Sequence, residues 1–275
     1  MTQLIDIINN NKSLSQVFHY LELGFHTSDA NIVLNCINSF QIEGEILTME
    51  VLSEFRKCAI EEMENRQYSK RDIVEMNNIV TIYGAASISV QSENIPEVNI
   101  DIDWAICFFD FAKNIQNQEL QSFWSKILEL ELRKPKSFFK RTLNVFYRAD
   151  KFEIDWFFQI TQFVFDKSCV PEFILTDNKF YPFNKFQTLI DAGFVNASLG
   201  GLSYPEAVTI HLTSVDMIIE IIKPPFSLSI YTLTDAGTQL FDLRPEKNTK
   251  EYLSKLKETI EKNNNAKVSS ILHKP

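Results

Sequence analysis

Residues 102–150 read IDWAICFFDFAKNIQNQELQSFWSKILELELRKPKSFFKRTLNVFYRAD, and this stretch decides the fold. Its large apolar residues recur at helical intervals, which predicts helices with one buried face each. One face consists of Trp104, Phe108, Phe109 and Phe111–Ala112, and the next of Leu120, Phe123, Trp124, Ile127, Leu128 and Leu130.

The ends of these helices can be placed from local signals. Asn117 is a suitable cap for the second helix. Pro135 is expected to end that helix, because the residue before a proline avoids the helical region. Ser137 is the expected cap of a third helix, which runs through Leu143 and Phe146. The stretch therefore predicts a compact three-helix unit.

Glu131 interrupts the apolar face of the second helix, because it follows Trp124 by seven residues and Ile127 by four. A buried carboxylate needs a partner. We expect an ion pair with Arg141 on the third helix, in a structural role. The alternative interpretation makes Glu131 and Arg141 the centre of an enzyme of unrecognised type.

The same stretch resembles the core of the bacterial family known as domain of unknown function 2806. Its pattern is W-x(3)-FF, Q-x(2)-W, L-x(2)-E, P-x-S-F and R-T-L. The matching residues are Trp104, Phe108, Phe109, Gln121, Trp124, Leu128, Glu131, Pro135, Ser137, Phe138, Arg141, Thr142 and Leu143. Weaker likeness extends upstream over residues 66–86 and downstream to Phe241.

Two positions depart from the family's pattern. The family usually has glycine after the proline, where this chain has Lys136, and Ala-Gly before the glutamate, where it has Glu129–Leu130. Similar helices occur in the abortive-infection alpha group of phage-resistance proteins. The family's activity is unknown, so the resemblance implies a context and no reaction.

Composition limits the remaining choices. The 275 residues carry a formal charge of −9, which argues against general nucleic-acid coating and against an anionic membrane surface. We expect no spanning helix and no signal peptide at the start of the chain. Four separated cysteines are typical of reduced thiols in the cytoplasm.

We predict a mainly α-helical protein in four regions: an N-terminal helical region (1–100), the central core (101–150), a winged-helix-like α+β module (151–243), and an amphipathic helix with a frayed tail (244–275). The third region reads as a helix over 183–192, then Gly193 in a left-handed cap, then β-prone runs over 208–212, 217–222 and 227–233, and last a helix capped by Thr234 or Asp235. Residues 93–103 read as an acidic linker.

The sequence offers few groups for chemistry. His19 and His26 lack a third ligand, and Asp101 and Asp103 read as a helix lead-in, so we expect no metal and no cofactor. Phosphate cradles, nucleophile elbows and zinc motifs are absent from the sequence. No catalytic residue is predicted.

The basic residues concentrate in residues 133–151, which hold seven lysines and arginines against Asp150. One interpretation is a phosphate or nucleic-acid contact formed by Lys134, Lys136, Lys140 and Arg148, and the other is a solvated turn. Residues 180–243 hold two basic and six acidic residues, which disfavours DNA reading by the winged-helix-like module.

The leading hypothesis is a non-enzymatic protein-interaction protein, in phage defence or a mobile element, with an unidentified protein partner and self-association through the C-terminal part. The alternatives are a DNA-binding regulator that uses residues 133–151 and the enzyme around Glu131 and Arg141.

Overall fold

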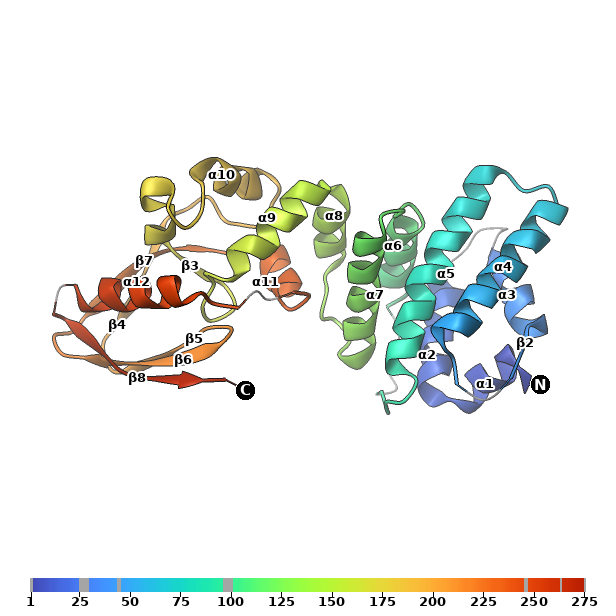
Figure 1. Ribbon diagram of the computed structural model, residues 1–275, viewed down its shortest axis with the longest axis horizontal. Helices are drawn as coiled ribbons and strands as arrows, with labels where there is room; N and C mark the ends of the chain where they lie inside the picture. Colours follow the sequence, from blue (N-terminus) through green and yellow to red (C-terminus); the bar gives the residue numbers. More distant parts are fainter. Residues whose placement is uncertain are drawn as a thin grey trace. The chain divides into compact units, whose positions relative to one another are not determined.

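The computed structural model describes residues 2–24, 30–43, 46–95, 101–244, 247–262 and 264–274. The chain forms two compact units, residues 1–144 and 145–275. The first consists mainly of helices and the second combines helices with antiparallel strands (Figure 1). This agrees with the prediction of a mainly α protein with a C-terminal α+β part.

The N-terminal unit is built from helices that pack around α5, with one short pair of strands. Its elements are β1 (Thr2–Gln3), α1 (Leu4–Asn10), α2 (Lys12–Gly24), α3 (Ala30–Ser39), β2 (Gln41–Ile42), α4 (Met49–Asn65), α5 (Lys70–Val90), α6 (Ile102–Ala112), α7 (Gln118–Arg133) and the start of α8 (Lys140–Arg148). Strands β1 and β2 pair antiparallel. The predicted helical character of this half of the chain is confirmed.

Helix α5 forms the centre of the N-terminal unit, because it packs against α2, α4, α6 and α7. Ser69 and Asp72 start it with a capping box. At Gly84 a Cβ atom would lie 2.3 Å from Cδ1 of Leu52 in α4, so the absence of a side chain lets the two helices approach closely. Among the described helices, α5 alone is long and apolar enough to cross a membrane, but more than half of its most apolar stretch is buried in this unit.

The three helices predicted over residues 102–150 are present as α6, α7 and α8. The Asp101 side chain accepts a 3.0 Å hydrogen bond from Trp104 N, and the Asn117 side chain accepts one of 3.1 Å from Leu120 N. Both residues therefore cap the helices that follow them. Of the predicted linker, residues 96–100 lie outside the described part of the chain, as does His26.

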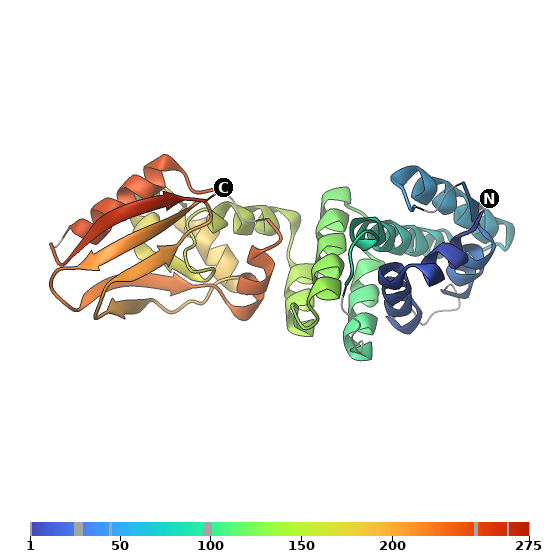
Figure 2. The same cartoon turned by 90° about the horizontal axis from the view of Figure 1, so that it is seen from below.

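The C-terminal unit contains two three-stranded antiparallel sheets, with strand orders β3-β7-β4 and β5-β6-β8. Helix α12 packs on β8 and runs along the strands (Figures 1 and 2). The elements are α9 (Lys151–Thr161), β3 (Cys169–Pro171), the 3-10 helix η1 (Glu172–Asn178), α10 (Phe183–Asp191), β4 (Gly200–Tyr204), β5 (Val208–His211), β6 (Val215–Ile221), β7 (Phe226–Thr232), α11 (Asp235–Phe241), α12 (Lys250–Glu261) and β8 (Ala266–His273).

The junction between α10 and α11 is tight. Gly193 has φ +86°, the left-handed conformation predicted for it. The Thr234 hydroxyl accepts a 3.1 Å hydrogen bond from Gly237 N and donates one of 2.7 Å to the Gly193 carbonyl. A Cβ atom on Gly237 would lie 2.2 Å from the carbonyl oxygen of Phe194. One threonine thus caps α11 and ties it to the end of α10.

The prediction of a frayed tail is wrong. Residues 266–273 form strand β8, which pairs with β6 along its length. Ala266 and Val268 are buried, while Lys267 and Ser269 are exposed, so the alternation of a half-buried strand is present. The pairing partner lies about fifty residues earlier in the chain, so the local sequence alone does not show it.

Candidate functional site

The candidate site is the turn between α7 and α8, residues 134–139, which we call the basic turn. Helix α7 ends at Arg133, and Lys134 is already extended, with φ −142°. Pro135 prevents the helix from continuing. Lys136 then adopts φ +68°, which reverses the chain toward α8.

Glu131, on α7, lies beneath the basic turn and is only 4% exposed. One carboxylate oxygen accepts a 2.6 Å hydrogen bond from Lys136 N and the other accepts a 3.1 Å bond from Phe138 N. Burial raises the pKa of Glu131, while the backbone N–H groups of Lys136, Phe138 and Ser137 act to lower it. Successive N–H groups in such a turn form an anion-binding concavity, which here holds the protein's own carboxylate.

Backbone N–H groups of the turn bind the buried carboxylate of Glu131, for which Arg141 was predicted as the partner. Arg141 is exposed on α8, whereas the hydrogen bonds to Glu131 come from the backbone of the turn. The left-handed conformation of Lys136 turns these N–H groups toward α7. An argument from the spacing of side chains on two helices cannot predict such a backbone contact. The arrangement gives Glu131 a structural role.

Ser137 also has a different role from the predicted one. Its hydroxyl donates a 2.5 Å hydrogen bond to the Lys134 carbonyl within the turn. Helix α8 begins three residues later, where Leu143 N donates to the Phe139 carbonyl. The expectation that Ser137 caps α8 is wrong, because the turn uses the hydroxyl to close on itself.

Aromatic residues of the family motif support the turn from below. The Trp104 indole Nε1 donates a 2.8 Å hydrogen bond to the Phe138 carbonyl. The Trp104 and Phe108 rings stack at 5.2 Å, and the Phe108 and Trp124 rings lie 5.3 Å apart. All of these side chains are buried, as are Phe109, Glu131 and Thr142. These motif residues form a core and not a surface.

Gln121 joins this core to α5. Its Nε2 donates to Asn78 Oδ1 at 3.0 Å and to the Ile115 carbonyl at 2.8 Å. Asn78 in turn donates a 2.8 Å hydrogen bond to the Lys113 carbonyl. Buried amides need such partners, so the glutamine fixes α7 on α5 and on the chain between α6 and α7.

The predicted lysines are on the outside of the turn. Lys134, Lys136 and Lys140 are exposed, and the Phe139 side chain between them is 47% exposed. Lys140 Nζ lies 3.6 Å from Asp103 Oδ2, with both side chains at least half exposed, so solvent weakens this ion pair. Arg148 is exposed at the far end of α8 and belongs to the C-terminal unit. The site thus consists of three lysines and one aromatic ring.

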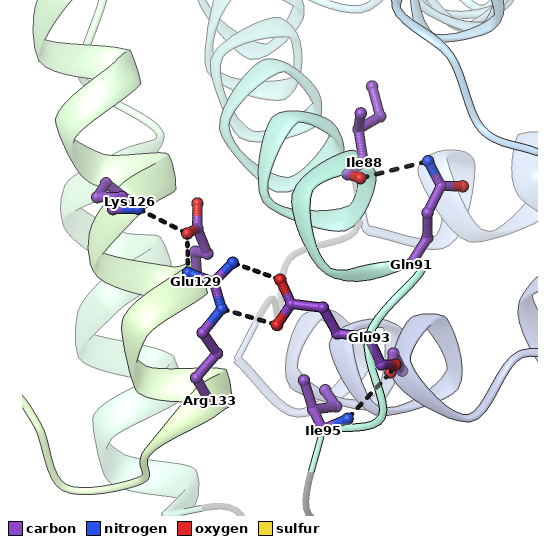
Figure 3. Close-up of polar contacts among 8 residues, drawn as sticks. Ile88, Gln91, Glu93, Ile95, Lys126, Glu129 and Arg133 are labelled. Carbon is purple, nitrogen blue, oxygen red and sulfur yellow. Dashed lines mark hydrogen bonds and ion pairs between the residues drawn. The ribbon is translucent and has the colours of Figure 1, made fainter. Parts of the chain in front are cut away.

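A charge network beside the turn was missed at the level of sequence (Figure 3). Arg133 donates from Nε to Glu93 Oε2 at 2.8 Å and from NH2 to Glu93 Oε1 at 2.5 Å. It also donates to Glu129, which accepts a 2.7 Å bond from Lys126. The spacing of Lys126, Glu129 and Arg133 signals part of this network, but Glu93 lies forty residues away. Arg133 therefore has a structural role, because it holds the segment that follows α5 against the end of α7.

These contacts lower the pKa of both carboxyl groups. The Arg133 hydrogen bonds lower the pKa of Glu93. For Glu129, burial acts to raise the pKa, but hydrogen bonds from Lys126 and Ser89 and the positive charges of Lys126 and Arg133 outweigh it. Both carboxylates are therefore more stable as anions in the folded protein.

Residues 61–175 match the model of a family described as protein of unknown function, DUF2806. The similarity to this family covers that region, which is less than half of the chain. The DUF2806 match covers α5 to α9 with the whole basic turn, includes the upstream stretch 66–86, and ends before most of the C-terminal unit. No curated protein and no solved structure matches the chain.

The resemblance implies a glycine after the proline, and the backbone of the turn offers a physical reason for it. The position needs φ +68°, which glycine adopts freely and other residues adopt at a cost. Within the described residues, no group of three or more His, Cys, Asp and Glu side chains could hold a metal ion. The chemistry that the basic turn offers is attraction of an anionic group.

Replacing Lys136 by glycine should raise the free energy of unfolding by up to about 1 kcal/mol, because it removes the cost of a left-handed lysine. Chemical denaturation measures this change. Lys134→Gly is the control, because Lys134 has an extended backbone. This variant should lower the free energy of unfolding by about 0.5 kcal/mol, because glycine gives the unfolded chain more freedom. Equal losses in both variants would contradict the assigned turn geometry.

Arg133→Ala should lower the free energy of unfolding by about 1–2 kcal/mol at neutral pH. Because Glu93 and Glu129 have lowered pKa values in the folded state, their stabilisation is present above the ordinary glutamate pKa and is lost as the pH falls through the folded values. The difference between variant and wild type should therefore shrink below about pH 4.

Denaturation of both proteins across a pH series measures this effect. Arg71→Ala is the matched control, because Arg71 pairs with Glu75 while its side chain is 80% exposed. It should leave the free energy of unfolding nearly unchanged, because solvent screens an exposed pair. A cost for Arg133→Ala that stays constant into acid would show that packing, and not the charge network, causes the loss.

Proposed function

We propose that this protein is a non-enzymatic interaction protein that recognises an acidic surface of a protein partner through the basic turn. The observation that carries the proposal is the display of Lys134, Lys136, Lys140 and Phe139 on a turn whose backbone is fixed by a buried carboxylate. A fixed backbone loses little freedom on binding, which favours affinity.

Charge supports a negatively charged partner. No acidic residue lies between Glu131 and Asp150, although the whole chain has a formal charge of −9. The basic turn is thus a positive region on a negative molecule, and such an asymmetry orients an approaching partner. Exposed Phe139 adds apolar contact area, and aromatic residues are enriched where interfaces gain most of their energy.

The enzyme hypothesis gains little support from the geometry. Both Glu131 oxygens accept backbone hydrogen bonds, and the carboxylate is buried under the turn. A general acid or base must reach the proton that it transfers. The contacts of Glu131 favour a role in folding.

The second candidate is a DNA-binding regulator, and the order of elements in the C-terminal unit favours it. The unit follows the plan of a winged helix with the β5–β6 hairpin inserted. Along the chain come helix α9, strand β3, the short η1, helix α10 and strands β4 and β7, and the sheet order is β3-β7-β4. This order supports a winged-helix-like module.

The side chains of α10 favour docking to protein over reading DNA. Its lysine, Lys185, lies 5.1 Å over the Trp156 ring, and its end carries the exposed Asp191. Phe183 and Phe152 are each about half exposed nearby on α10 and α9. We assign self-association to this aromatic surface of the C-terminal unit.

The proposed setting is the cytoplasm of a bacterium, in phage defence or on a mobile element. The resemblance to abortive-infection proteins suggests this setting, and the four free cysteines are typical of a reducing compartment. Plating efficiency of phages on cells with and without the gene tests it.

Fluorescence anisotropy with three labelled probes tests the function: a poly-glutamate peptide, a single-stranded oligonucleotide and a duplex of equal charge. We expect the peptide to bind with an affinity that falls as salt rises. The triple variant Lys134→Glu/Lys136→Glu/Lys140→Glu should weaken peptide binding by about tenfold or more, because it reverses the charge of the site.

The matched control is Lys247→Glu/Lys250→Glu/Lys257→Glu, which changes the net charge equally at exposed lysines outside the basic turn. It should leave most of the affinity intact. Equal weakening by both variants would show that net charge and not the turn determines binding. Duplex binding tighter than peptide binding, abolished in the turn variant, would replace the proposal by the regulator.

A further inference from the structure

A strong anion-binding side chain lies directly beside the basic turn, and carboxylates of the protein itself occupy it. Arg133 precedes Lys134 in the chain, and its guanidinium lies between Glu93 and Glu129 (Figure 3). Nε donates to one oxygen of Glu93 at 2.8 Å, NH2 donates to the other at 2.5 Å, and NH1 donates to Glu129. A guanidinium that binds both oxygens of one carboxylate makes a stronger and more specific contact than a lysine does.

The two carboxylates on Arg133 differ in how far solvent reaches them. The Glu129 side chain is only 10% exposed, and it also accepts a hydrogen bond from Lys126. The side chains of Arg133 and Glu93 are 33% and 37% exposed. Solvent therefore screens the Arg133–Glu93 contact, and a carboxylate from outside can compete for it. Glu129 would keep the guanidinium in place during such an exchange.

Contacts other than the Glu93 carboxylate also hold the backbone on which it is carried. Gln91 Oε1 accepts a 2.8 Å hydrogen bond from Leu47 N, and Gln91 Nε2 donates one of 2.7 Å to the Leu47 carbonyl. The Ser13 hydroxyl donates a 2.5 Å hydrogen bond to the Glu93 carbonyl. The Glu93 side chain can therefore leave Arg133 by rotation about its own bonds, while the segment after α5 stays in place.

We propose that Glu93 is an autoinhibitory ligand of Arg133, and that an acidic partner displaces it, so that Arg133 joins the lysines of the basic turn in binding. This inference rests on the proposed function, because it concerns the same site and the same class of partner.

The internal carboxylate favours partners that carry several negative charges. A single carboxylate gains little by displacing Glu93, because it replaces a contact of the same chemistry. An acidic segment that Lys134 and Lys136 already hold presents its next carboxylate to Arg133 at a high effective concentration. Glu93 therefore excludes small anions from Arg133 and admits a polyacidic surface.

The test compares wild type with Glu93→Gln in binding of the labelled poly-glutamate peptide, measured by fluorescence anisotropy with the whole chain. Glutamine keeps the size of the side chain and removes its charge, so that Arg133 becomes open to the peptide. We expect the affinity to rise about threefold to tenfold, because the protein no longer spends binding energy on releasing Glu93. Adding Arg133→Gln to this variant should remove the gain.

Two further variants separate the contact from net charge. Glu62→Gln makes the same change of charge on α4, outside the basic turn, where Glu62 accepts a 2.7 Å hydrogen bond from Arg66. It should change the affinity by less than about twofold, because salt screens a distant charge. Glu93→Asp keeps the net charge but shortens the side chain, so it should raise the affinity by a smaller factor than Glu93→Gln.

The outcomes distinguish this inference from the proposed function. Equal affinities of wild type, Glu93→Gln and Glu93→Asp would overturn the inference and leave the proposed function standing, as would an equal gain in Glu62→Gln. Peptide binding by neither wild type nor Glu93→Gln would overturn both. The unfolding temperature of each variant shows whether it folds, and Glu93→Asp decides the matter if Glu93→Gln does not fold.

Discussion

The interaction on which the N-terminal unit depends most is the seat of the Glu131 carboxylate under the backbone of the turn between α7 and α8. Without it, the N–H groups of Lys136 and Phe138 would face a buried space with no acceptor, and orphaned buried donors are costly. The Trp104 indole completes the arrangement by binding the Phe138 carbonyl from α6. Helices α6, α7 and α8 are thus joined through the backbone of one short segment.

This internal order explains the outer surface. Because the polar backbone groups of the turn point inward to Glu131, its lysines and Phe139 point toward solvent. Lys136 occupies a left-handed position that glycine would fill at lower cost, so the chain keeps a charged side chain where stability alone favours none. Such a cost is typical of a position retained for binding.

Much of the fold follows from local signals in the sequence. Asn117, Gly193 and Thr234 were predicted from short-range rules for helix ends, and each has the predicted role. These rules depend on residues within one turn of the helix, which the sequence states directly.

What the sequence did not predict depends on contacts between distant residues. Glu131 was expected to bind a side chain, and the structure shows that it accepts a hydrogen bond from the backbone N–H of Lys136. The positive φ angle of Lys136 sets the direction of this backbone segment. Arg133 was only counted among the basic residues of 133–151, whereas Glu93, forty residues away, binds it. Strand β8 needed knowledge of β6, because a short alternating segment forms a strand only where an edge is available.

Amide hydrogen exchange tests the central claim most directly, with wild type compared to Glu131→Gln. Glutamine has the same shape, but its NH2 group would face one of the two backbone donors. We expect the amides of Lys136 and Phe138 to exchange about tenfold faster or more in the variant, while amides in the middle of α5 keep their protection. Unchanged exchange at both turn amides would contradict the account, because some other group would then hold the turn.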